Sequence, residues 1–177
     1  MLNKEEATEL LYQNISTETL IKHSKAVGAI MKHLAIFLGF DPAKWEVTGL
    51  IHDLDYEVTK HNVDEHAVKT VQMLKGAIDV EMENAVLAHN DKKVIQTPIE
   101  IALYASDPLS GFITAAVLVI PSQNIRDLKV SSLKKKFKDK SFAKGANREN
   151  ILKIEQLGIT LEIFFEIALK AFEEESL

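Results

Sequence analysis

The side chains of this chain that could bind a metal ion form an ordered series. An adjacent pair, His52 and Asp53, interrupts an otherwise apolar segment. Imidazole and carboxylate together form the mixed nitrogen and oxygen ligand set that suits Zn, Mn, Fe, Co or Ni, and each group is costly to bury without a partner. Four further candidates flank the pair along the sequence: His23, His66, His89 and Asp107.

Two of these histidines are predicted to face the protein interior. At about 100° per residue, His23 falls within the apolar stripe of its helix, and His89 lies on the side of another helix that carries Met82 and Val86. A core histidine with a backbone hydrogen-bond partner explains either residue alone. Two inward-facing histidines on separate helices favour a shared site instead.

The His52-Asp53 pair is predicted to lie at the end of a helix. His52 shares a helix face with Thr48 and Gly49, and these small residues would allow another helix to approach closely. Asp53 points about 100° further around the helix, so both side chains can serve one ion only where the helix ends.

Asp107 is the only charged residue between positions 101 and 120. A buried carboxylate with no cation nearby is costly unless it stays protonated, so metal binding is the simplest explanation. His66 is predicted at the margin of the apolar face of a helix over residues 63–75, where it would line a cleft. His33 and His61 are predicted to lie on the surface, because polar residues at such positions are mostly solvated.

Helix start and stop signals recur along the chain, with neither alternating strand patterns nor internal repeats. Ser16 is a candidate N-cap for a helix that stops at Gly39, and Asp41-Pro42 and Thr97-Pro98 each combine an N-cap with a first-turn proline. The sequence therefore predicts an all-α fold, a compact multi-helix bundle. The expected helices cover residues 16–38, 42–53, 63–75, 79–90, 98–121, 148–157 and 160–174.

Length and composition narrow the class of protein. A chain of 177 residues fits a single domain, residues 1–177, and the absence of cysteine excludes disulfides, thiolate metal sites and cysteine nucleophiles. The acidic N-terminus lacks the features of a signal peptide, so a cytoplasmic location is expected. Residues 101–120 are apolar, but Asp107, Pro108 and Gly111 interrupt them, which favours a buried central helix and no membrane partner.

The charge of the chain is unevenly distributed. The formal net charge is −5, yet a cluster of basic residues runs from Lys134 to Arg148 with Asp139 as its only acid. The overall charge argues against long nucleic acid as a partner, whereas the basic segment could hold phosphate. The alternative is a solvated lysine face, and the sequence specifies no oligomeric state.

The order of these residues resembles the HD superfamily of metal-dependent phosphohydrolases: a histidine on an early helix, a His-Asp pair, and an aspartate on a later helix. The resemblance covers roughly residues 16–120 as an HD-type core, with 121–177 as a C-terminal helical extension. The segments Gly49–Tyr56 and Ala105–Phe112 look like those of small stand-alone bacterial and archaeal members. By this resemblance, four residues match the defining metal ligands: His23, His52, Asp53 and Asp107.

The resemblance implies hydrolysis of a phosphate ester, in a nucleotide or similar small phosphorylated metabolite, by water activated on one or two divalent ions: Mn, Fe, Zn, Ni, Co or Mg. His66 and His89 match positions that in some members bind a second ion or the substrate phosphate, and Asp53 would then bridge two ions. If they are not ligands, both histidines could act as proton donors to the leaving group.

Three points stay open at the level of sequence. Some nucleotidase relatives carry a catalytic glutamate three residues after the pair, where this chain has Tyr56 between Asp55 and Glu57. Lys144 or Arg148 could contact the substrate phosphate. A non-catalytic metal- or ligand-binding module and a purely structural helical protein are the alternatives to an enzyme, although the complete four-ligand set favours the enzyme.

Overall fold

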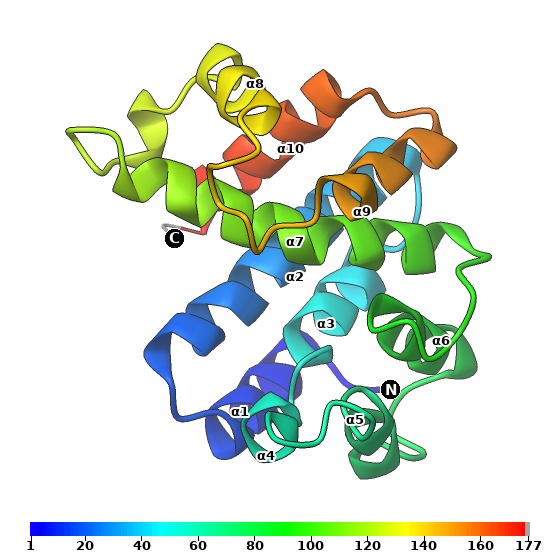
Figure 1. Ribbon diagram of the computed structural model, residues 1–177. Helices are drawn as coiled ribbons and strands as arrows, with labels where there is room; N and C mark the ends of the chain where they lie inside the picture. Colours follow the sequence, from blue (N-terminus) through cyan, green and yellow to red (C-terminus); the bar gives the residue numbers. More distant parts are fainter. Residues whose placement is uncertain (176–177) are drawn as a thin grey trace.

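A computed structural model describes residues 1–175, and within that range every regular element is a helix, which confirms the all-α prediction (Figure 1). The α-helices are α1 (Lys4–Asn14), α2 (Glu18–Leu38), α3 (Pro42–Ile51), α4 (Tyr56–Thr59), α5 (Val68–Met73), α6 (Val80–His89), α7 (Pro98–Leu118), α8 (Val130–Lys138), α9 (Arg148–Leu152) and α10 (Leu161–Glu174). Short 3₁₀ turns lie at Ile125–Asp127 and Lys153–Leu157.

The helix start and stop signals in the sequence predict most helix ends correctly. Gly39 ends α2 in the left-handed region, at φ 77°, and the Asp41 side chain accepts hydrogen bonds from the first backbone N–H groups of α3. At the start of α7, the Glu100 side chain accepts a hydrogen bond from the backbone N–H of the N-cap residue Thr97 (3.1 Å). The N-cap position of α2 is Thr17 rather than the predicted Ser16, and α7 continues through Pro108.

Other predicted boundaries were wrong. The helix expected over residues 63–75 is only α5, because Ala67 adopts a positive φ of 69° that interrupts the helical path. The helix expected over 148–157 divides into α9 and a 3₁₀ turn. Helices α1 and α8 were not predicted, although Val130, Leu133 and Phe137 have helical spacing.

The buried apolar side chains pack as two clusters. One cluster joins α2, α7 and the C-terminal helices, including Phe112, Phe164 and Phe165; the other joins α1, α3 and α6, including Leu11 and Met82. Helix α7 is long and apolar enough to cross a membrane by length and composition alone, but 61% of that stretch is buried in this fold. Its role here is that of a central core helix.

Helices α2 and α3 approach each other more closely than two ordinary helices. A Cβ added to Gly49 of α3 would lie 2.7 Å from the Cα and N of Gly28 in α2. The prediction that small residues beside His52 admit a second helix is thereby confirmed. This contact fixes the end of α3, where His52 lies, against the helix that carries His23.

Candidate metal centre

Six side chains from five parts of the chain converge on one pocket of about 280 Å³. His23 comes from α2 and Asp107 from α7, while His52 follows the last residue of α3 and is succeeded by Asp53. His89 is the last residue of α6. The turn before α5 supplies His66, which was expected within a helix.

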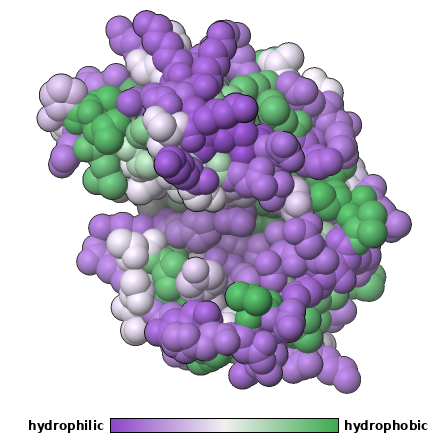
Figure 2. Space-filling model, in the orientation of Figure 1, coloured by the Kyte–Doolittle hydropathy of each residue, from purple (hydrophilic) through white to green (hydrophobic). Residues whose placement is uncertain are grey.

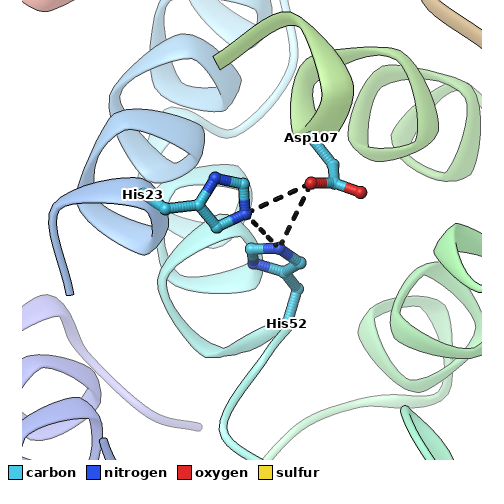
Figure 3. A group of neighbouring side chains, drawn as sticks. All are labelled: His23, His52 and Asp107. Atoms are coloured by element: carbon cyan, nitrogen blue, oxygen red, sulfur yellow. Dashed lines mark hydrogen bonds and ion pairs between the residues drawn. The ribbon is translucent and has the colours of Figure 1, made fainter. Parts of the chain in front are cut away.

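Four of these side chains form one group around the His52 ring. His23 Nε2 lies 3.3 Å from His52 Nε2 and 3.2 Å from Asp107 Oδ1, and the three side chains point toward one another from separate helices (Figure 3). Asp53 Oδ2 lies 3.4 Å from His52 Nε2 and 3.7 Å from His23 Nε2. This arrangement brings together the four residues predicted as ligands.

The second oxygen of Asp53 faces a different pair of histidines. Asp53 Oδ1 lies 3.3 Å from His66 Nε2 and 3.2 Å from His89 Nε2. The two oxygens of one carboxylate thus divide the cluster into two groups of possible ligand atoms.

Each histidine ring is anchored through Nδ1. His52 donates to the carbonyl of Gly49 (2.8 Å), and His89 donates to the carbonyl of Val86. A carbonyl can only accept, so Nδ1 carries a proton in both rings, and Nε2 is the nitrogen that faces the pocket and could bind a cation.

The other two rings are held by side chains. Ser110 donates its hydroxyl to the backbone carbonyl of Asp107 (2.9 Å) and accepts from His23 Nδ1 (2.8 Å). His66 Nδ1 donates to Asp55 Oδ1 at 2.7 Å. Such partners at the second ring nitrogen are typical of metal-binding histidines, because they fix both the tautomer and the ring orientation.

Two observations test whether these residues fit a cation. His89 Nε2 is buried and has no aligned hydrogen-bond partner within the described residues, although Asp53 Oδ1 is near. Atoms held about 2.0–2.2 Å from one ion lie roughly 2.8–3.6 Å apart, and most separations in both groups fall in this range. The donor set fits a divalent cation, which would satisfy the unpaired Nε2.

The charges in the cluster are consistent with this fit. Burial opposes ionisation of Asp53, but the neighbouring His52, His66 and His89 outweigh it and hold the pKa of Asp53 well below its usual range. Burial likewise opposes ionisation of Asp107, yet His23 lowers its pKa. Both carboxylates are therefore negatively charged at neutral pH.

The pKa values of His52 and His66 shift in opposite directions. Burial lowers the pKa of His52 to about 4, which keeps this ring neutral and available as a ligand. Burial would also lower the pKa of His66, but hydrogen bonds and attraction to Asp53 and Asp55 outweigh it and raise the pKa to about 9. In the absence of a cation, His66 carries a proton that a metal ion would have to displace.

The acidic residues after the pair have structural roles that the sequence left open. The buried Asp55 binds His66 and also accepts from the backbone N–H of Thr70 (3.0 Å). Glu57 accepts hydrogen bonds from the backbone N–H groups of Ser16 and Thr17 at the start of α2. Both carboxylates are engaged in hydrogen bonds that hold the local structure.

The roles of Asp55 and Ser110 as hydrogen-bond partners of the candidate ligands His66 and His23 were missed from the sequence. The spacing between Asp107 and Ser110 was the available signal, because positions i and i+3 share one helix face. Asp107 itself is less buried than expected, with 32% of its side chain exposed. It lines the pocket mouth together with Leu20, Tyr56 and Asn90.

The other histidines and the basic residues lie outside the pocket. His61 is exposed as predicted, whereas His33 is buried, and its Nε2 lies 3.0 Å from a carboxylate oxygen of Glu174 because α10 packs over that side of α2. The structure does not bring Lys144 or Arg148 to the histidine pocket. Both line a separate hollow, and the Arg148 guanidinium is occupied by the carbonyls of its own loop.

The domain model for the HD domain matches residues 20–116, which is more than half of the chain. The chain belongs to the HD domain family. HD domains bind divalent metal ions and are characteristic of metal-dependent phosphohydrolases, and the histidine and aspartate cluster described above provides suitable donors.

This HD protein is also similar to larger proteins. It is 30% identical over 105 residues to ribonuclease Y of Lawsonia intracellularis, and 26% identical over 104 residues to ribonuclease Y of Nitratidesulfovibrio vulgaris. Each similarity covers 58% of this chain but 20% of the relative. The similar region therefore spans only a small part of those proteins, and no solved structure matches the chain significantly.

Proposed function

We propose that this HD protein is a phosphohydrolase with two divalent ions. His23, His52, Asp53 and Asp107 would hold one ion, and His66, His89 and the second oxygen of Asp53 would hold the other. The observation that carries this proposal is the orientation of Asp53, whose two oxygens face two different pairs of histidines. A bridging carboxylate of this kind supports a two-metal centre.

The substrate we propose is a phosphate ester of a nucleotide or similar small phosphorylated metabolite. Divalent ions at this centre supply a water of lowered pKa and stabilise charge on the phosphoryl oxygens. Neither lysine nor arginine is among the described residues that line the pocket. The protein itself would therefore contribute ligand orientation and neutral polar groups, Tyr56 and Asn90, and phosphate binding would depend on the ions.

The similarity to ribonuclease Y supports a second substrate class for the same centre. The name of these relatives denotes cleavage of RNA, a phosphodiester, and the similar region is the size of the HD domain. Phosphodiesters and phosphomonoesters require the same in-line attack on phosphorus, so both belong in the first substrate panel.

The test is phosphate or nucleotide release from nucleotides, simple phosphate esters and short RNA in the presence of Mn, Fe, Zn, Ni, Co or Mg. We expect metal-dependent hydrolysis that Asp53→Ala abolishes, because this substitution removes a ligand from both groups. The matched control is His61→Ala, which removes an exposed histidine outside the pocket and should leave activity unchanged. Stoichiometric metal without hydrolysis of any substrate would favour a binding module, and a protein that binds no metal would refute the proposed centre.

A further inference from the structure

The basic residues of this protein are concentrated in one segment. Eight of the 21 Lys and Arg residues, but one of the 26 Asp and Glu residues, lie between Lys129 and Arg148. This segment carries a formal charge of +7, which leaves −12 on the rest of the chain. The modest net charge of −5 therefore hides a strongly polarised molecule.

Most of these positive charges are not neutralised within the fold. Lys134 pairs with Glu162 at 2.7 Å, but in the described part of the chain no carboxylate oxygen lies within 4.0 Å of Lys135, Lys138, Lys140 or Lys144. The one acid of the segment, Asp139, is occupied by the backbone N–H and hydroxyl of Ser141, at 2.8 and 2.6 Å.

Several lysines elsewhere on the surface are paired with acids. Lys22, Lys69 and Lys170 each pair with a glutamate four residues before or after them on their own helix or turn. Lys60, Lys75 and Lys153 also have no carboxylate oxygen within 4.0 Å among the described residues, but they lie far apart along the chain, so it is the concentration of unpaired cations that distinguishes the basic segment.

The basic segment has a defined conformation. The Arg148 guanidinium donates to the backbone carbonyls of Phe142, Ala143 and Ala146 and lies over the Phe112 ring, 4.8 Å from its centroid. Leu133 is fully buried and anchors α8 to the core. The lysines therefore project from a packed framework.

These lysines surround a hollow on one face of the molecule. Lys138, Lys140 and Lys144 line an open depression of about 710 Å³ between α8 and α9. The segment that connects these helices crosses in front of α7, which carries Asp107 (Figure 1). Figure 2, in the same orientation, shows that this face is largely hydrophilic.

We propose that the exposed lysines of residues 129–148 form a docking surface for the phosphate backbone of a single-stranded nucleic acid. The unpaired cations are spread over α8, about 13 Å long, and the following loop. This spacing suits a ligand with repeated phosphates better than a compact phosphate, which requires converging donors. The nearby aromatic rings pack on one another and on Arg148, so binding depends on charge rather than on base stacking.

The test is binding of a labelled single-stranded RNA by fluorescence anisotropy at several salt concentrations, with a chelator present. Chelation prevents cleavage, so the result does not depend on the function proposed for the metal centre. Neutralisation of about four phosphates predicts a slope of log affinity against log salt near −3. The triple variant Lys138→Glu, Lys140→Glu, Lys144→Glu should bind at least about tenfold more weakly, with a slope reduced by about 2.

The matched control changes the net charge by the same amount at paired lysines: Lys22→Glu, Lys69→Glu, Lys170→Glu. It should bind RNA within about twofold of the parent protein, since the basic segment is intact. Thermal melts check that both variants fold, which is expected because the mutated side chains lie at the surface. Equal weakening in the two triple variants, absence of salt-dependent RNA binding, or preferential binding to anionic phospholipid vesicles would overturn the proposal.

Discussion

Replacement of Gly49 by alanine should damage both the packing of the fold and the metal centre. The added Cβ would lie 2.7 Å from the Cα and N of Gly28 and 2.9 Å from the carbonyl carbon of Val27. Carbon atoms pack at about 3.5–4.0 Å, so α3 must move away from α2 by roughly 1 Å. All three contacts are with backbone, which cannot rotate out of the way.

The size of the effect follows from this shift. Overpacking of a core costs about 1–3 kcal/mol, and backbone contacts place Gly49→Ala at the upper end, near 3 kcal/mol. For a chain of this length that corresponds to a melting temperature lower by roughly 6–12 °C. The carbonyl of Gly49 also anchors His52. Because ligand distances tolerate about 0.2 Å, a displaced His52 should weaken metal binding as well.

Urea unfolding of the metal-free protein, followed by metal titration of the folded variants, provides the assay. Two further glycines make a graded series. A Cβ at Gly111, in the exposed part of α7, meets nothing within 4 Å, so Gly111→Ala should stabilise the protein by about 0.8 kcal/mol. A Cβ at Gly28 meets Leu50 Cγ at 3.0 Å and should give an intermediate loss. Unchanged stability and metal affinity in Gly49→Ala would refute the close approach as the determinant of His52 geometry.

Three other predictions concern the hydrogen bonds and charges of Asp55, His66 and Arg148. Asp55→Asn should reduce the metal content from two ions to one, measured by elemental analysis, because it weakens the anchor of His66 while the group around His52 stays intact. The melting temperature of the metal-free protein should fall between pH 6.5 and 9, because the folded-state pKa of His66 is raised to about 9 and its stabilising contribution is lost as pH rises through that range. The melting temperature of the metal-bound protein, measured in the same dye-based melt, should instead rise with pH, since protons compete with the ion. Parallel curves for the two forms would contradict both the assigned pKa direction and metal binding at His66. Arg148→Lys should lower the free energy of unfolding, measured by urea denaturation, by about 2–3 kcal/mol, because it removes hydrogen bonds to loop carbonyls. The same variant should leave hydrolysis of small phosphate esters unchanged. A loss of activity without a loss of stability would instead indicate that Arg148 contacts the substrate.

The sequence predicts the candidate site well because its signal is chemical and local. His52 and Asp53 are adjacent, and Asp107 is a lone charge in an apolar helix, so neither observation requires a tertiary structure. His23 and His89 could be placed from helical periodicity. The structure adds the distances, which depend on how five segments meet, and the partners of the His23 and His66 rings, which come from other segments.

The failures have a common origin in tertiary contacts and local backbone conformation. His33 lies off the stripe of His23, yet α10 covers it, and the position of α10 cannot be read from α2 alone. The predicted helix around His66 fails because Ala67 adopts a positive φ, which cannot be inferred from the residue type. Arg148 was one of two candidates for a contact with the substrate phosphate, whereas its donors are occupied by carbonyls that only the folded loop presents.

The anchoring of His52 and His89 has a consequence for protein design. Each ring is oriented by the carbonyl three residues earlier in its own helix, so its direction is set before any other segment docks. A helix that ends in histidine with this bond is a transferable module. Transplanting the centre into an unrelated helical scaffold would then need no additional side chain to orient these two rings, whereas His23 and His66 would need Ser110 and Asp55 to be transferred with them.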